Sequence, residues 1–273
     1  MKKIVFLVFT LLTSNIIIQA QTPQSLKKVM ELKMPKTVDD DMCGTRGAIV
    51  AWHPVQKKLY AAFAGNEGFP MGVFDEKGKR LSSEDLTTMA DTRGLWYDPS
   101  AKSLYGNGYS DMGWFAYTLD KTGIPTDAEV EKEGMNQPGV QSVGTYNTAG
   151  KQVLFLNLSQ VYMYNKDAEP VDSILIHWGR KKTDGADEDE DIVRQHEDYN
   201  SSSVVYTGIK GQELGLLNIT NKQVELYDIK TGFLTKVLTL PETSVVEPFF
   251  NFAYANGTYW LFNIEMRKWV GYK

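Results

Sequence analysis

Residues 97–123 of the 273-residue chain read YDPSAKSLYGNGYSDMGWFAYTLDKTG. An aromatic residue, Tyr97, is followed by a tight turn and a renewed apolar segment, and a later apolar segment ends at Asp120 before a Lys-Thr-Gly turn. Short segments rich in aromatic residues and bounded by Gly, Asn, Asp and Pro are typical of β-strands joined by turns. This stretch therefore predicts a small antiparallel sheet.

The same order of features recurs along the chain. An aromatic residue before a turn is found at Trp52, Tyr97, Tyr146, Tyr206 and Tyr254. An apolar segment that ends in Asp or Asn recurs with spacings of 45, 45 and 63 residues, at Asp75, Asp120, Asn165 and Asp228. A further 45 residues reach position 273, the last of the chain. The sequence therefore contains five copies of one unit.

A unit of about 45 residues with four short strands is typical of a propeller blade. We therefore predict an all-β fold, a five-bladed β-propeller with four antiparallel strands per blade. No long segment shows the 3.6-residue apolar period of a helix, so helices should be rare.

The fifth copy lacks an outer strand, because the chain ends directly after residues 268–272. Residues 26–32 (LKKVMEL) are similar to residues 234–240 (LTKVLTL), the outer strand of the fourth copy. An N-terminal strand that completes the last blade would leave no open edge. We therefore expect residues 26–32 to pair with residues 268–272 and close the ring.

With these repeats, the chain resembles the broad group of bacterial secreted β-propellers with YVTN, NHL and WD40-like repeats. It lacks the Gly-His and Trp-Asp pairs of WD40 blades, and the resemblance is to no narrower family. Because many functions share this architecture, the resemblance implies a fold and no activity.

The N-terminus predicts a secretory signal peptide at residues 1–20, followed by the propeller at 21–273. A basic start precedes an apolar run at 4–12, and Ala20 is a small residue suited to cleavage. The alternative is an uncleaved anchor, but a membrane span needs about 20 apolar residues, and residues 13–15 interrupt this one. We expect a periplasmic or secreted protein without an integral membrane segment after cleavage. The junction at 19–21 resembles that of Bacteroidetes exports.

The net charge, the cysteine count and the acidic segment limit the partners, disulfides and metal sites that we expect. The net charge of −5 leaves no basic excess for a phosphate backbone, so we expect no nucleic-acid partner. Cys43 is the single cysteine and cannot form an intramolecular disulfide. The acidic segment 184–198 resembles an EF-hand loop, but Ile192 stands where that loop needs Gly. We read it as a solvated loop, with Ca²⁺ binding left open, and we expect no cofactor and no metal site.

The connections divide into two groups. Turns within the first and last strand pairs of each unit are short and should lie on one rim, the tight-turn face. Long connections at 38–46, 82–93, 127–141, 180–200 and 242–247 should lie on the other rim, the long-loop face. Long loops on a rigid scaffold often carry binding sites. The alternative is that they are only variable surface.

Two of the long connections end in Thr-Arg-Gly, which would place Arg46 and Arg93 at the channel mouth. Two guanidinium groups there would hold a carboxylate, sulfate or phosphate. The alternative is that each arginine pairs with a local aspartate, Asp41 or Asp91, and only holds its loop in place.

Further candidates lie on the same face. Three residues hold positions comparable to the two arginines in the other copies: Gln141, Asn200 and Glu247. Three more lie in loops between second and third strands: Glu67, Asp111 and Trp114. An exposed Trp114 would stack on a sugar or a heterocycle, whereas a tryptophan inside a blade would belong to the core.

No known catalytic motif is present, so two functions stay open. The first is a non-catalytic binding or scaffold protein that takes a small molecule, a glycan or a partner protein at the long-loop face. The second is a lyase or hydrolase for a sugar or lactone, with catalytic groups gathered from several blades around the channel. Its candidate residues are Arg46, Arg93, Glu67, Asp111 and Glu247.

Overall fold

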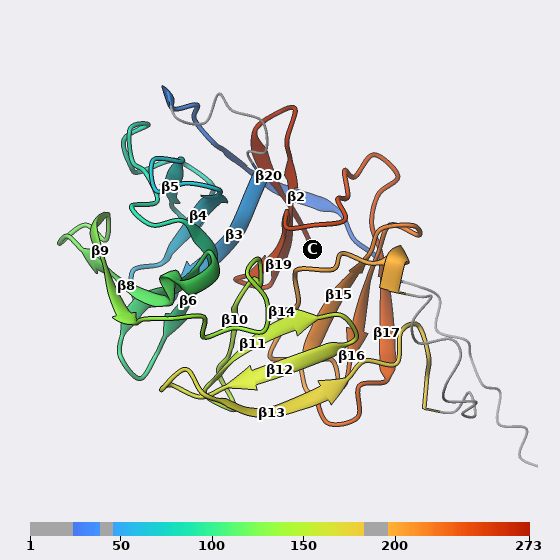
Figure 1. Ribbon diagram of the computed structural model, residues 1–273. Coiled ribbons are helices and arrows are strands. Elements are labelled where there is room, and N and C mark those ends of the chain that lie inside the picture. The colour runs from blue at the N-terminus through green and yellow to red at the C-terminus, as the bar shows by residue number, and fades with distance from the viewer. Residues whose placement is uncertain (1–23, 39–45, 183–195) are drawn as a thin grey trace, which may run out of the picture.

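The computed structural model describes residues 24–38, 46–182 and 196–273. The predicted signal peptide, Asp41, Cys43 and most of the acidic segment lie outside the described residues. Five small sheets surround a common centre (Figure 1), so the prediction of an all-β, five-bladed propeller is confirmed. Helix in the described ranges is limited to short 3₁₀ turns, and η2 (Ser110–Met112) and η3 (His196–Asp198) are the two that lie wholly within these ranges.

The blades follow the order of the repeats. The first contains β3 (Arg46–His53), β4 (Lys58–Ala64) and β5 (Met71–Phe74), and the second contains β6 (Thr92–Asp98), β7 (Ser103–Gly108), β8 (Trp114–Leu119) and β9 (Pro125–Lys132). The third contains β10 (Thr145–Asn147), β11 (Gln152–Asn157), β12 (Gln160–Tyr164) and β13 (Pro170–Leu175). The fourth contains β14 (Val205–Tyr206), β15 (Leu214–Asn218), β16 (Gln223–Tyr227) and β17 (Leu234–Thr239). The fifth contains β18 (Phe252–Ala255), β19 (Thr258–Asn263), β20 (Lys268–Tyr272) and β2 (Lys28–Lys33).

Two blades depart from the four-strand plan. In the first blade the outer position is held by an irregular segment, in which the Leu81 amide donates to the Val73 carbonyl and Arg80 forms an isolated bridge with Phe74. The fourth blade gains an additional strand, β1 (Gln24–Ser25), which runs parallel to β17. The sequence repeat predicted neither departure.

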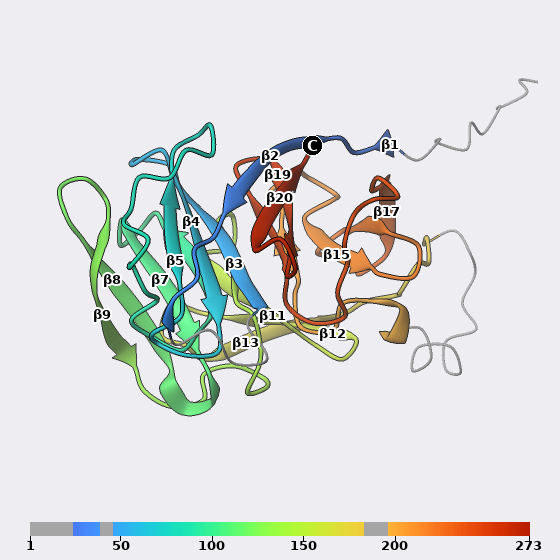
Figure 2. The same cartoon turned by 90° about the horizontal axis from the view of Figure 1, so that it is seen from above.

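The N-terminal segment closes the ring, as predicted. β2 pairs antiparallel with β20, with Leu32 opposite Trp269. Figure 2 shows that the segment then reaches the neighbouring blade, where Gln24 pairs with Leu238 of β17. One continuous segment thus holds the fourth and fifth blades together and covers two sheet edges.

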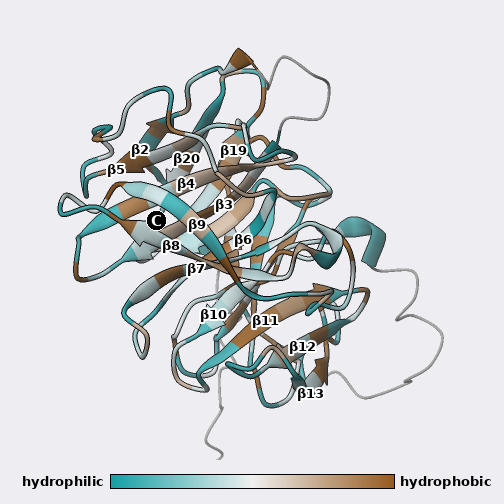
Figure 3. Ribbon diagram, turned by 60° about the vertical axis from the view of Figure 1, so that its left-hand side comes forward, coloured by the Kyte–Doolittle hydropathy of each residue, from teal (hydrophilic) through white to brown (hydrophobic). Residues whose placement is uncertain are grey.

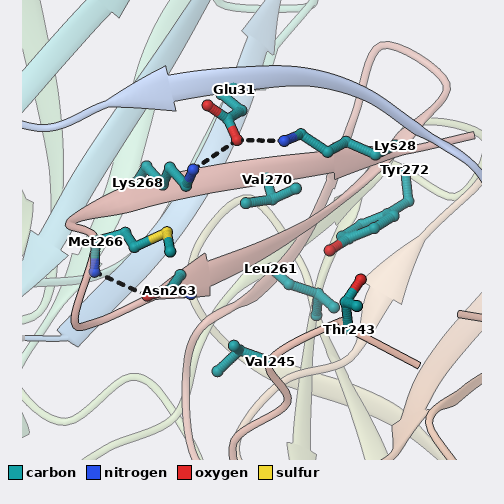
Figure 4. A pocket seen from close by; sticks show the side chains of 10 residues that line it. All are labelled: Lys28, Glu31, Thr243, Val245, Leu261, Asn263, Met266, Lys268, Val270 and Tyr272. Carbon is teal, nitrogen blue, oxygen red and sulfur yellow. Dashed lines mark hydrogen bonds and ion pairs between the residues drawn. The ribbon is translucent and has the colours of Figure 1, made fainter. Parts of the chain in front are cut away.

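An ion-pair cluster accompanies this closure (Figure 4). The Glu31 carboxylate lies 2.6 Å from Lys268 Nζ and 2.5 Å from Lys28 Nζ. Hydrogen bonds from these two lysines lower the pKa of Glu31. Because exposed ion pairs add little stability, the strand pairing and the fully buried Leu32 contribute most of the closure.

The core lies between the blades. The inner strands are buried along most of their length, as β4 and β15 are, and Figure 3 shows apolar stretches on several strands. The largest cluster joins the fifth, first and second blades and includes Tyr60, Phe63, Trp260 and Trp269. Burial of both faces of each sheet leaves the rims and the channel as the surfaces available for function.

Candidate functional site

The long-loop end of the channel is organised around the ring of Phe250, which is 1% exposed. The guanidinium carbon of Arg46 lies 4.9 Å from the ring centroid, and that of Arg93 lies 5.9 Å from it. Both distances suit cation–π interactions. The two arginines singled out in the sequence therefore meet at one buried aromatic ring.

Arg93 is an internal residue of this end. It is 4% exposed, its Nη1 atom lies 2.5 Å from Asp91 Oδ1, and its Nε donates to Gln141 Oε1 at 2.6 Å. Burial lowers the pKa of Arg93, the bond to Asp91 acts against that shift, and the charge of Arg46 adds to it. For Arg93, the alternative that the arginine pairs with a local aspartate is therefore the one that the structure shows.

Arg46 is half-buried and lines a cavity of about 380 Å³. The polar residues that share this lining are Gln141, Ser142, Asn157, Ser201 and Ser202. No carboxylate lines the cavity, and within the described ranges no ion pair joins Arg46 to one. Among the described residues that line the cavity, Arg46 therefore carries the only charged side chain.

The backbone beneath the cavity is strained. Phe250 and Asn251 have φ values of 52° and 58°, in the left-handed region that non-glycine residues rarely occupy. Ser202 Oγ accepts a hydrogen bond from the Phe250 amide at 2.6 Å, and the Gly47 amide donates to Asn251 Oδ1 at 2.7 Å. Strain of this kind costs about 1–3 kcal/mol per residue and persists only where surrounding contacts enforce it. The cavity floor is therefore held in a defined shape.

Asn200 is one of those contacts. It is fully buried, and its Nδ2 atom donates to the carbonyl oxygens of Glu247 and Phe250, each at 2.8 Å. Its Oδ1 atom accepts the amide hydrogens of Ser202 and Ser203. The predicted candidate Asn200 thus lies beneath the cavity and holds the loops in place, while the Glu247 carbonyl is one of its acceptors.

A buried carboxylate positions the segment before Asn200. Glu225 is 4% exposed and accepts hydrogen bonds from Tyr199, Tyr227 and Asn218, at 2.8, 2.5 and 3.0 Å. These three donors satisfy a group that would otherwise be costly to bury. Glu225 therefore fixes Tyr199, the direct neighbour of Asn200.

The structure does not bring the remaining candidates into the cavity. Glu67 and Asp111 are exposed and are not among its lining residues. Of the two alternatives for Trp114, the structure shows the core position, because the side chain is 4% exposed and packs edge-to-face on Trp96 at 5.4 Å. The expected loop at 127–141 begins only after β9 ends at Lys132, and the Asn136 carbonyl then accepts a hydrogen bond from Trp114 Nε1.

The other end of the channel is lined by the aromatic residues that precede the first turn in each of the five repeats. All five are half-buried and line a hollow of about 230 Å³ without any charged side chain: Trp52, Tyr97, Tyr146, Tyr206 and Tyr254. Tyr97 packs on His53 of the preceding blade at 4.2 Å between ring centroids. The Tyr146 hydroxyl donates to Asp98 Oδ1 of its preceding blade at 3.3 Å. Their constant place in the repeat was the signal that they converge.

Two further searches concern the described ranges only. They contain no group of three or more His, Cys, Asp or Glu residues arranged to hold a metal ion. They also contain no helix with the length and apolar character needed to span a bilayer.

No family model and no curated protein matches the chain. Solved structures are similar to it in fold. The glutaminyl cyclase of Myxococcus xanthus is 10% identical, with a TM-score of 0.55 over 92% of this chain and 98% of that chain. The Cps50 (Swd1) β-propeller domain of Myceliophteria thermophila is also 10% identical, with a TM-score of 0.45 over 85% and 98% of the two chains. Identities this low show the fold alone, which agrees with the resemblance to the broad propeller repeat group.

Proposed function

We propose that the protein is an exported, non-catalytic binding propeller whose long-loop channel mouth takes a small anionic ligand with a carboxylate, sulfate or phosphate group. The observation that carries this proposal is Arg46, which lines a cavity together with neutral polar side chains and, among the described residues, no acidic one. A guanidinium binds such oxyanions through paired hydrogen bonds.

The surroundings support recognition of an anion. The neighbouring Arg93 adds a second positive charge, and in the described part of the chain Asp91 forms an ion pair with Arg93 and not with Arg46. Ser201 and Ser202 provide hydroxyl groups, and Gln141 and Asn157 provide amide groups, all of which can donate to oxygen atoms. The enforced backbone at Phe250 reduces the ordering cost that binding would otherwise carry.

Export rests on the sequence of residues 1–20, which has the layout of a signal peptide. A periplasmic or extracellular location is therefore part of the proposal. N-terminal sequencing of the protein recovered from the native cell envelope and medium tests it, because cleavage after Ala20 is expected.

The enzyme hypothesis requires a carboxylate that acts as acid or base beside the bound ligand. Glu67, Asp111 and Glu247 are absent from the lining of the Arg46 cavity. No specific observation on the described residues therefore favours a lyase or hydrolase over a binding protein.

Calorimetry with inorganic phosphate, sulfate and citrate tests the anion site. We expect at least one of them to bind, and Arg46→Ala to weaken that binding at least tenfold, since a charge-assisted hydrogen bond contributes about 1.5–3 kcal/mol. Arg46→Lys should restore only part of the affinity because it retains the charge without the paired geometry.

Lys210→Ala is the matched control, because it removes an exposed positive charge from the tight-turn face. Equal binding by the native chain and the Arg46→Ala variant would place the anion elsewhere. Failure of all three anions to bind would refute the proposal.

A further inference from the structure

A second hollow lies between the second and third blades. Its volume is about 290 Å³, and it shares Trp96 and Tyr146 with the aromatic hollow at the tight-turn end of the channel. Aromatic side chains from both blades line it: Trp96, Trp114 and Tyr105 from the second, and Tyr146 from the third. The two tryptophans are buried, whereas Tyr105 and Tyr146 are half-buried and present part of their rings to the hollow.

Three polar groups in this lining have no protein partner within the described ranges. The Tyr105 hydroxyl, the Glu131 carboxylate and the Lys151 ammonium group make no hydrogen bond or ion pair there, although all three line the hollow. Burial raises the pKa of Tyr105, and the charges of Glu131 and Asp98 raise it further. Both carboxylates therefore act on the Tyr105 hydroxyl.

Other polar groups of the lining are already engaged. Asp98 Oδ1 accepts the Tyr146 hydroxyl at 3.3 Å and the Ser100 amide at 2.7 Å. Lys132 lies 3.7 Å from Asp167, and Lys166 lies 3.0 Å from the same carboxylate. The contacts of Tyr146 with Asp98 and of Lys132 with Asp167 cross from the second blade to the third and hold the walls. The open donor and acceptor positions therefore belong mainly to Tyr105, Glu131 and Lys151.

The combination of aromatic rings, a carboxylate and an ammonium group in this lining indicates which class of ligand the hollow would bind. A purely apolar ligand would desolvate Glu131 and Lys151 without giving them hydrogen bonds, which is costly. An ion of either sign would meet like charges, because the lining contains the carboxylates of Asp98 and Glu131 as well as three lysines, Lys132, Lys151 and Lys166. A neutral polyhydroxyl ring avoids both problems, since each hydroxyl both donates and accepts while the apolar faces of the ring pack on aromatic side chains.

We propose that the hollow between the second and third blades is a binding site for a neutral saccharide. Tyr105 and Tyr146 supply the stacking surfaces. The Glu131 carboxylate accepts hydrogen bonds from sugar hydroxyls, and the Lys151 ammonium group donates to them. The site is independent of the anion cavity and lies apart from the eight residues singled out for ligand binding in the sequence, except that Trp114 lies in its wall.

Saturation-transfer NMR on the full mature chain tests the proposal with the methyl glycosides of glucose, galactose, mannose and N-acetylglucosamine. We expect at least one to bind in the millimolar range or tighter. Tyr105→Ala should weaken that binding about tenfold through the loss of a stacking surface. Glu131→Gln and Lys151→Gln should each weaken it severalfold, and both residues are exposed, so the fold should tolerate the changes.

Lys210→Gln is the matched control on the tight-turn face, and Arg46→Ala is the control at the anion cavity. Neither change should alter saccharide binding. The proposal fails if none of the four glycosides binds, or if binding survives the changes at Tyr105, Glu131 and Lys151. It also fails if only methyl glucuronide, tested as a charged analogue, binds. Each of these results leaves the anion experiment with Arg46 unaffected, so the two proposals stand or fall separately.

Discussion

The two ends of the channel are built from different chemistry. At the long-loop end, polar side chains whose type changes from blade to blade form a network: Asn200 bonds to two carbonyl oxygens, and Arg46 and Arg93 flank Phe250. At the tight-turn end, equivalent aromatic residues from all five blades line one hollow. The repeat thus builds a regular aromatic end, and the irregular loops build a unique charged end.

This difference separates two ways of joining blades. At the long-loop end the blades are joined by hydrogen bonds of buried amide groups. Removal of one such group leaves a buried partner without a hydrogen bond, so each contact contributes strongly to the free energy of unfolding. Half-buried tyrosine rings hold the tight-turn end, where contact area is shared among five residues and water is nearby. We therefore expect single substitutions to disturb the long-loop end more than the tight-turn end.

The largest effect is expected for Asn200→Ala. It leaves the carbonyls of Glu247 and Phe250 without their buried donor, so the free energy of unfolding should fall by about 3 kcal/mol. Urea denaturation followed by circular dichroism measures this change. Asn221→Ala, at an exposed turn position, is the control and should be close to neutral. A loss for Asn200→Ala no larger than that of the control would contradict the amide network.

A smaller loss is expected for Tyr97→Ala at the tight-turn end. The half-buried ring packs on His53, and its removal should cost about 2 kcal/mol on the same urea assay. Tyr97→Phe keeps the ring and should be almost neutral. A Tyr97→Ala loss greater than that of Asn200→Ala would reverse the ranking of the two ends.

Alkaline pH should act on the tight-turn end with a still smaller effect. Burial and the neighbouring Asp98 raise the pKa of Tyr146 to about 12, above its ordinary value of 10.0. The folded protein thus keeps this proton where the unfolded chain loses it, so the contribution is complete below pH 10 and declines as pH rises toward 12. Tyr146→Phe should reduce the slope of unfolding free energy against pH in that window, and an unchanged slope would argue against this environment.

Salt gives the smallest expected change and separates the two proposed sites. Sodium chloride should weaken anion binding at Arg46 severalfold between low salt and 0.15 M because it screens charges. Saccharide binding between the second and third blades should not change. Parallel titrations of phosphate and the best methyl glycoside measure both. Equal salt dependence at the two sites would contradict a neutral saccharide.

The site at the long-loop channel mouth was partly predictable from local sequence patterns. Arg46 and Arg93 were placed at the channel mouth because both end a long connection with Thr-Arg-Gly. The sequence left both an exposed and a core position open for Trp114, and the strand β9 and the following turn place it in the core. Glu131 and Lys151 carried no local signal, since they lie on different blades and meet only where the two sheets pack.

The sequence by itself determined the number of blades and their closure, because the spacing of strands and turn residues repeats along the chain and residues 26–32 match the outer strand at 234–240. Only the tertiary structure decided that Asp91 engages Arg93, that Trp114 is buried and that Glu131 and Lys151 line one hollow. Those outcomes depend on distances between side chains from different blades, and no periodic pattern along the chain encodes how irregular loops fold over their neighbours.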